Sequence, residues 1–81
     1  MHVRARLFAS LRDAAGTAEL GLELEKGATA GDAWSALVAR HPSLAPRRAA
    51  LAAAVNRRYR DWDTVLEEGD EVAFIPPVSG G

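Results

Sequence analysis

The end of the sequence, EVAFIPPVSGG (residues 71–81), constrains the fold more strongly than any other stretch of the chain. Residues 72–75 are all apolar, as expected for a strand that is covered on one face and partly contacted on the other. Pro76 and Pro77 lack backbone N–H donors and fix φ, so strand pairing must stop there. The turn signal at residues 67–70 marks where this strand begins. The stretch therefore predicts a final strand that leads into a short tail.

The tail itself points to chemistry rather than packing. Glycine loses the most conformational freedom on ordering, so Gly80 and Gly81 favour a flexible tail and contribute little stability. A carboxyl group on Gly81 has no side chain beside it and fits a narrow active site. A carboxylate is a poor electrophile, so ATP must first convert it to an acyl-adenylate. Sulfide or a persulfide then gives a thiocarboxylate, whereas a lysine amine gives an isopeptide, and the glycines do not separate these two fates.

Working back along the chain, the pattern predicts an α+β domain. Alternation predicts strands at residues 3–7 and 20–24, with a helix between them that is capped by Ser10, carries Asp13 in its first turn and stops at Gly16. Thr29 caps the principal helix, whose apolar positions Trp34, Leu37, Val38 and His41 follow helical spacing until Pro42.

The rest of the chain before the final strand is less regular. A short helix is expected to about residue 50, followed by a strand to Asn56, although propensity alone favours helix throughout. Residues 57–63 are expected to form a loop or a short edge strand. A mixed sheet of four to five strands on one main helix, an α+β roll, follows as a single domain over residues 1–81, with residues 76–81 as its exposed tail.

Composition excludes several classes of function. The chain has 81 residues, a net charge of −1 and no cysteine, so it offers no disulfide, no thiolate metal site and no persulfide of its own. A near-neutral charge gives no general attraction to nucleic acid. Two separated histidines, His2 and His41, make a metal site improbable. No signal peptide and no apolar run long enough to cross a membrane is visible, so we expect a cytoplasmic protein without a nucleic-acid or membrane partner.

Several side chains are candidates for partner binding. Val78 flanks the tail beyond the sheet and is expected to dock on a partner, and Phe74 is a second candidate with core packing as the alternative. Trp62 lies in a polar loop and is an interface candidate, whereas Phe8 and Leu11 are expected in the core. Arg57, Arg58 and Arg60 meet either solvent or an acidic partner, with a solvated loop as the default. Glu67, Glu68, Asp70 and Glu71 are expected to form a solvated turn.

The whole chain resembles the small subunit of molybdopterin synthase, that is, the MoaD family of ubiquitin-like β-grasp sulfur carriers. The final segment is the most specific part, because related carriers for thiazole or tRNA thiolation usually share the Gly-Gly but not the full Pro-Pro-Val-Ser-Gly-Gly context. Arg57-Arg58 departs from the family, which often has a Gly-containing turn there. The resemblance is carried by Val3–Arg12, Gly16–Thr17, Gly27–Thr29, Ala53–Asn56, Asp63–Thr64 with Leu66, and Gly69–Gly81.

The resemblance implies a ubiquitin-like β-grasp fold and a sulfur-transfer cycle. A MoeB-like adenylating enzyme uses ATP on Gly81, a sulfur donor makes the thiocarboxylate, and the tail inserts into the MoaE-like large subunit of a heterotetramer. Sulfur then passes to cyclic pyranopterin monophosphate and builds the dithiolene of molybdopterin. This chain would bind no cofactor and act as carrier more than enzyme. Gly80 and Gly81 would be the reactive end, with Phe74, Pro76, Pro77, Val78 and Ser79 against the partner.

Two alternatives stay open at this point. A ubiquitin-like modifier, or a carrier for tRNA or thiazole thiolation, would keep the fold and the activated glycine but change the acceptor. A plain protein-binding module would make the tail incidental.

Overall fold

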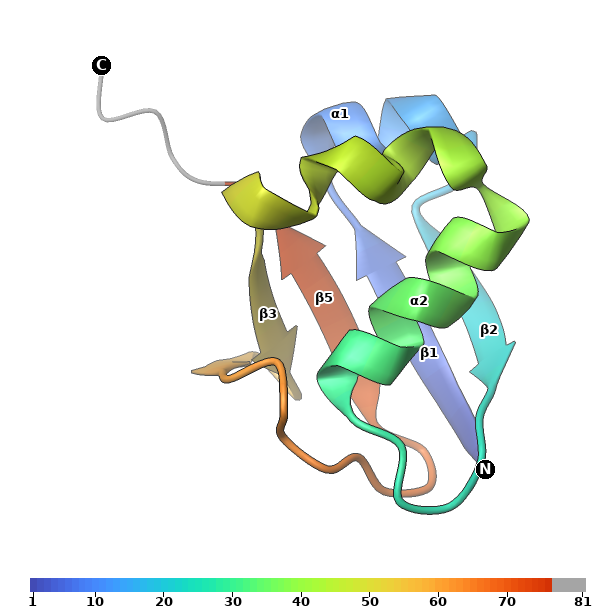
Figure 1. Cartoon of the computed structure of the whole chain (residues 1–81), viewed down its shortest axis with the longest axis vertical. Coiled ribbons are helices and arrows are strands. Elements are labelled where there is room, and N and C mark those ends of the chain that lie inside the picture. The colour runs from blue at the N-terminus through green and yellow to red at the C-terminus, as the bar shows by residue number, and fades with distance from the viewer. Residues whose placement is uncertain (77–81) are drawn as a thin grey trace.

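A five-stranded mixed sheet, crossed on one face by a single long helix, forms the framework of the protein (Figure 1). The computed structural model describes residues 1–76. The helix α2 lies over the sheet, and two shorter helical segments, α1 and η1, lie at the end of the sheet where β5 stops. The elements are β1 (His2–Leu7), α1 (Ala9–Ala15), β2 (Glu19–Glu23), α2 (Ala30–Arg40), the 3₁₀ segment η1 (Pro42–Ala50), β3 (Ala52–Val55), β4 (Arg58–Arg60) and β5 (Glu71–Ile75).

The first and last strands of the chain pair in parallel at the centre of the sheet. The strand order is β2-β1-β5-β3-β4, and every other neighbouring pair is antiparallel. The central register sets Arg4 opposite Glu71 and Leu7 opposite Phe74. This is the β-grasp, or ubiquitin-like, arrangement, and the predicted α+β roll with a mixed sheet is confirmed.

Alternation along the strands divides the sheet into a buried and an outer face. In β1, Val3, Ala5 and Leu7 are almost fully buried, whereas the residues between them point away from the core. The same period of two places Val72 and Phe74 of β5 inside. Side chains of α2 close this core from the other side, chiefly Ala33, Trp34 and Leu37.

The principal helix starts and ends where the sequence predicts. The Thr29 hydroxyl accepts a hydrogen bond from the Asp32 N–H at 3.1 Å, and the Asp32 carboxylate accepts one from the Thr29 N–H at 2.9 Å. This reciprocal capping box satisfies two donors that the first helical turn leaves without partners. The helix ends at Arg40, before Pro42, and Trp34 is buried as expected.

The predicted cap of α1 is wrong. Phe8 occupies the N-cap position in an extended conformation without a side-chain cap, and its carbonyl accepts hydrogen bonds from Leu11 and Arg12. Ser10 therefore lies within the helix, where its hydroxyl accepts from the Arg47 guanidinium at 2.9 Å, and Asp13 lies past the first turn. The predicted stop at Gly16 is confirmed, since Gly16 caps the helix with φ 77°.

The segment with conflicting signals resolves into a 3₁₀ helix and a strand, as expected. The 3₁₀ segment η1 includes Pro46 and runs to Ala50, after which β3 begins at Ala52. Ala53 lies almost fully buried in β3, where a small side chain lets the sheet approach the layer above it. Residues 58–60 then form the short edge strand β4 that the sequence left as an alternative to a loop.

One asparagine joins two turns at the lower end of the sheet. Asn56 donates from Nδ2 to Asp70 Oδ1 at 2.9 Å, and its Oδ1 accepts from the Glu71 N–H at 3.0 Å. Asp70 in turn accepts from the Glu67 N–H at 2.8 Å, which closes the predicted turn. The residues of this acidic segment are thus not all solvated, because Asp70 and Glu71 are half-buried and hydrogen-bonded.

Replacing Thr29 with Ala tests the capping box. The variant loses the hydroxyl acceptor for the Asp32 N–H, so we expect its free energy of unfolding to fall by about 1 kcal/mol. Urea denaturation followed by circular dichroism measures this change. Ser35→Ala, at an exposed position of the same helix, is the matched control and should change stability by less than about 0.5 kcal/mol. Equal losses in both variants would contradict the cap.

Candidate functional site

The face of the sheet opposite α2 carries a shallow groove next to the end of β5. Its apolar part comes from three strands and from Phe8, which follows β1. Phe8 is 40% exposed and Tyr59 is 69% exposed, and both lie on this groove. The groove encloses about 420 Å³ and is lined by Arg6, Phe8, Ala54, Arg57, Tyr59, Glu71, Ala73 and Ile75.

Small residues make this surface hollow. Ala54 of β3 lies opposite Ala73 of β5 in the antiparallel register, and Tyr59 of β4 lies opposite Ala54. Two neighbouring alanines form a low floor, and the larger side chains of Phe8, Tyr59 and Ile75 surround it. Apolar area of this kind, rimmed by charged residues, is typical of a protein interaction surface.

The charges around the groove are unevenly paired. Arg6 contacts Glu71 at 3.7 Å and also lies over the Phe8 ring, 5.7 Å from its centroid. Further along the same face, Arg4 pairs with Glu19 at 3.5 Å. The Arg4–Glu19 pair is exposed and contributes little stability, whereas Arg6–Glu71 is partly buried, and together they keep the β1–β2 half of the face polar. The apolar half therefore lies over β5, β3 and β4.

Phe74 faces the opposite way, and the expectation that it contacts a partner is wrong. It is fully buried, in T-shaped contact with Trp34 at 5.1 Å between ring centroids. Trp62 stacks on Phe74 at 5.9 Å with an interplanar angle of 8°. The reason is the strand period, which directs Phe74 inward and leaves its neighbours Ala73 and Ile75 on the outer face.

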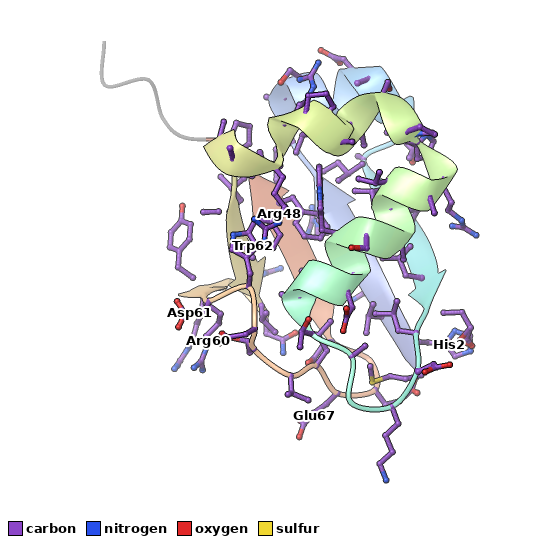
Figure 2. All side chains as sticks on the ribbon, in the orientation of Figure 1. His2, Arg48, Arg60, Asp61, Trp62 and Glu67 are labelled. Atoms are coloured by element: carbon purple, nitrogen blue, oxygen red, sulfur yellow. The ribbon has the colours of Figure 1, made fainter. Side chains whose placement is uncertain are left out.

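Trp62 completes this aromatic cluster instead of standing free as an interface residue. It is half-buried, and the Arg48 guanidinium lies 4.0 Å above its ring, a cation–π contact between η1 and the loop after β4. Figure 2 shows Arg48 and Trp62 together beside the end of β5, away from His2 and Glu67. The cluster thus fixes the end of β5 from the side opposite the groove.

The other predicted site residues divide into two groups. Pro76 is half-buried and directly follows β5. Pro77, Val78, Ser79, Gly80 and Gly81 lie outside the described residues. Sequence reasoning missed Phe8 and Ile75 as surface residues, although continuing the alternation of β1 and β5 by one position would have placed both on the outer face.

The arginines of the β3–β4 hairpin do not act as one group. Arg57 lines the groove, whereas Arg58 and Arg60 line a separate hollow with Val55, Thr64 and Glu67. The strand period again explains the separation, because Arg58 and Arg60 pair with Val55 and Ala53, whose side chains face the core side of the sheet.

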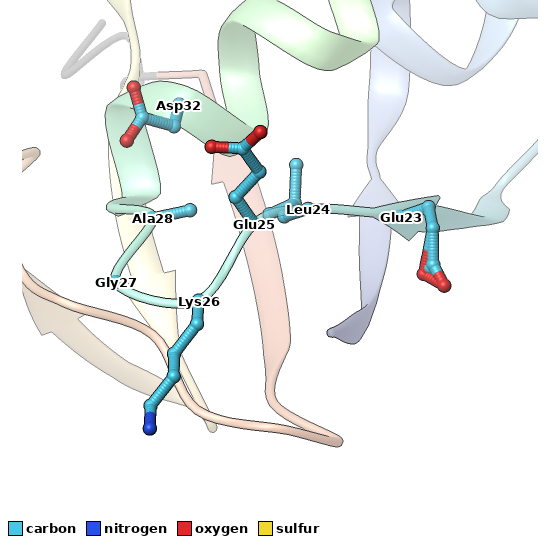
Figure 3. Close-up of a pocket in the computed structure, with 7 residues that line it drawn as sticks. All are labelled: Glu23, Leu24, Glu25, Lys26, Gly27, Ala28 and Asp32. Atoms are coloured by element: carbon cyan, nitrogen blue, oxygen red, sulfur yellow. The ribbon is translucent and has the colours of Figure 1, made fainter.

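A third hollow, between β2 and α2, offers no comparable chemistry (Figure 3). Asp32 is already engaged in the capping box, and Figure 3 shows Lys26 directed away from Asp32 and Glu25. Within residues 1–76, no group of histidine and carboxylate side chains is arranged to hold a metal ion. Among the same residues, no helix is long and apolar enough to cross a bilayer.

The fold defines a ubiquitin-like protein, and comparison with known proteins agrees. The chain belongs to the ThiS family, whose model matches residues 5–81. The resemblance to molybdopterin synthase small subunits is confirmed: a molybdopterin synthase sulfur carrier subunit from Chlamydomonas reinhardtii is 40% identical over 83 residues, covering 100% of both chains.

Archaeal modifier proteins are similarly related. Small archaeal modifier protein 1 from Haloferax volcanii is 38% identical over 84 residues, covering 94% of this chain and 97% of the relative. The crystal structure of SAMP1 from Haloferax volcanii superposes with a TM-score of 0.91 at 32% identity and covers 100% of both chains. Sequence and fold thus relate this chain to both groups.

Replacing two adjacent residues of β5 with Ala tests which of them belongs to the core and which to the surface. Phe74→Ala removes the ring at the centre of the aromatic cluster, so we expect the free energy of unfolding to fall by about 3–5 kcal/mol. Ile75→Ala, the matched control on the outer face, should cost about 1 kcal/mol. Urea denaturation of both variants measures the difference. If Ile75→Ala proved as costly as Phe74→Ala, the assignment of the two faces would be wrong.

Proposed function

We propose that this protein is the sulfur carrier subunit of molybdopterin synthase. One observation carries the proposal: the likeness to named sulfur carrier subunits runs the full length of the chain, and the family model extends through the Pro-Pro-Val-Ser-Gly-Gly segment to residue 81. The site residues proposed at the reactive end are Gly80 and Gly81.

The activation step requires a partner enzyme and ATP. In the proposed cycle, a MoeB-like enzyme lets the Gly81 carboxylate attack the α-phosphate of ATP, which releases pyrophosphate and leaves an acyl-adenylate. Sulfide (HS⁻) supplied by a donor then attacks the acyl carbon, AMP leaves and one proton is released. The product is a Gly81 thiocarboxylate, a soft nucleophile that this cysteine-free chain does not otherwise possess. No cofactor is bound by this chain in these steps.

The transfer step takes place in a complex with a MoaE-like large subunit, which we propose forms a heterotetramer with two copies of the carrier. In each transfer the Gly81 thiocarboxylate exchanges its sulfur for one oxygen of cyclic pyranopterin monophosphate, so the carrier leaves with its carboxylate restored. Two such transfers build the dithiolene. The large subunit supplies most of the substrate pocket. Pro76, Pro77, Val78 and Ser79 are proposed to contact it as the tail enters.

The described residues support the carrier role through the two faces of β5. The inner face, held by Phe74 and its aromatic neighbours, fixes the strand that leads into the tail. The outer face presents Ile75 and Ala73 within the apolar groove. A partner that receives the tail approaches this groove directly, since Ile75 is separated from Pro77 by one residue. In this proposal the outer-face residues Ala73 and Ile75 guide the partner toward the tail, whereas Phe74 on the inner face stabilises the core.

A ubiquitin-like modifier is the second candidate, and the likeness to the Haloferax volcanii modifier favours it. The same adenylate would then be attacked by a lysine amine of a target protein, which forms an isopeptide bond and releases AMP. The fold and the groove suit a sulfur carrier and a modifier equally, because each function begins with adenylation of the tail by a partner enzyme. The two functions differ only in the molecule that accepts the activated tail or its sulfur.

Deleting Gly81 tests the proposed reactive end. The variant should keep the thermal midpoint of the full chain, because the core lies within residues 1–76, and it should gain no sulfur from the adenylating enzyme, ATP and a sulfur donor. Intact mass spectrometry checks the sulfur, and synthesis of molybdopterin with the large subunit checks the transfer. Ser35→Ala, at an exposed position of α2 outside the proposed site, is the control and should retain the activity. A deletion variant that still made molybdopterin would refute the proposal.

Conjugation in the host cell tests the second candidate. A modifier produces a ladder of higher-mass species, recognised by an antibody to this chain and lost on deletion of Gly81. The sulfur-carrier proposal predicts that a strain lacking this gene loses molybdopterin, and that no such ladder accompanies the wild-type chain. If the wild-type chain gives a ladder and the strain lacking the gene still makes molybdopterin, the modifier function is favoured and the carrier function is refuted.

A further inference from the structure

The turn between β3 and β4 holds an arginine where the backbone favours glycine. The hairpin loop is two residues long, since Val55 pairs with Arg58, and both loop residues have positive φ: 50° at Asn56 and 70° at Arg57. This is a type I′ turn, in which Asn-Gly is the preferred pair. Asn56 fits that preference, but Arg57 places a Cβ in the left-handed region at a cost in conformational energy.

The strained conformation is imposed from the neighbouring residue. The Asn56 backbone N–H donates to the Glu71 carbonyl at 2.8 Å, and its side chain bonds to Asp70 and Glu71. These contacts fix the turn whatever residue follows, so they explain how Arg57 is tolerated but not why it is present. Backbone strain that the surroundings enforce is found preferentially at functional sites.

No contact within the described chain explains the arginine either. Among residues 1–76, the Arg57 guanidinium makes no ion pair and no hydrogen bond, whereas Arg6 on the same groove is paired with Glu71. Arg57 lines the groove beside Tyr59 and Ala54. The groove therefore carries one uncompensated positive charge next to its apolar floor.

We propose that Arg57 is a selectivity determinant of the docking face, and that its guanidinium receives a carboxylate of the large subunit when that subunit covers the groove. This inference rests on the proposed function. A planar guanidinium can grip a carboxylate through two parallel hydrogen bonds, and the apolar floor excludes water around the pair. A protein that presents a positive or uncharged surface to Arg57 binds less favourably than one that presents a carboxylate. The ion pair therefore selects the partner as well as attracting it.

The chain offers a matched control one residue away. Arg58 lies on the same hairpin, and replacing it with Glu changes the net charge by the same amount as the replacement of Arg57. Its side chain, however, lines the separate hollow that contains Val55 and Thr64. Isothermal titration calorimetry of the full-length chain against the purified large subunit of the same organism compares Arg57→Glu with Arg58→Glu. We expect Arg57→Glu to weaken the Kd about tenfold or more and Arg58→Glu to change it less than about twofold.

A glycine variant separates binding from folding. Arg57→Gly relieves the left-handed strain, so its thermal midpoint should equal or exceed that of the wild type while its Kd weakens at least about threefold. Arg57→Lys keeps the charge without the planar fork and should bind with intermediate affinity. Gain in stability with loss of affinity is a result that a merely structural arginine does not give.

The outcomes distinguish the two proposals. If the wild-type chain binds the large subunit and Arg57→Glu binds as tightly as Arg58→Glu, the role of Arg57 is refuted and the carrier function stands. Arg57→Gly with undiminished affinity refutes that role as well. If the wild-type chain itself does not bind the large subunit, both proposals are overturned.

Discussion

The parallel pairing of β1 with β5 is the constraint on which the rest of the structure depends. It joins the first strand of the chain to the last, places Leu7 beside Phe74 at the centre of the core, and leaves the remaining strands to add on at the two sides. A parallel pair cannot be closed by a short turn, so the intervening chain must cross over, and α2 covers the sheet in doing so. The end of β5 is fixed by this pairing, and the tail begins from a rigid base.

Two adjacent residues of β5 show how stability and recognition are kept apart. Phe74 is enclosed by Trp34 and Trp62, and Arg48 covers the outside of Trp62, so packing energy is concentrated on one side of the strand. Ile75 turns to the other side and joins the groove. Because the strand period separates them, the groove can change without altering the core. Arg57 follows the same logic, since its turn is held by Asn56 and not by its own side chain.

Periodicity and turn chemistry were sufficient to predict most of the fold. Alternation in β1, the Thr29 capping box and the Gly16 stop were all confirmed, because each depends on short-range rules. Ser10 was misplaced because a close strand-to-helix connection began α1 before the apparent cap. Phe74 was assigned to a partner because its neighbour in sequence is the tail. The period of two along β5 directs its ring toward the core, and only the side chains that enclose it there, Trp34 and Trp62, are distant in sequence and hidden from a local pattern. The groove, built from three strands, was equally hidden.

The intact mass of the protein purified from its own host is the first test of the proposal that Gly81 carries sulfur. We expect a species in which one oxygen is exchanged for sulfur, mapped to the C-terminal peptide, and we expect it to form from unmodified protein with the adenylating enzyme, ATP and a sulfur donor. Failure to gain sulfur in that complete mixture, with the fold intact by circular dichroism, would refute the sulfur-carrier proposal.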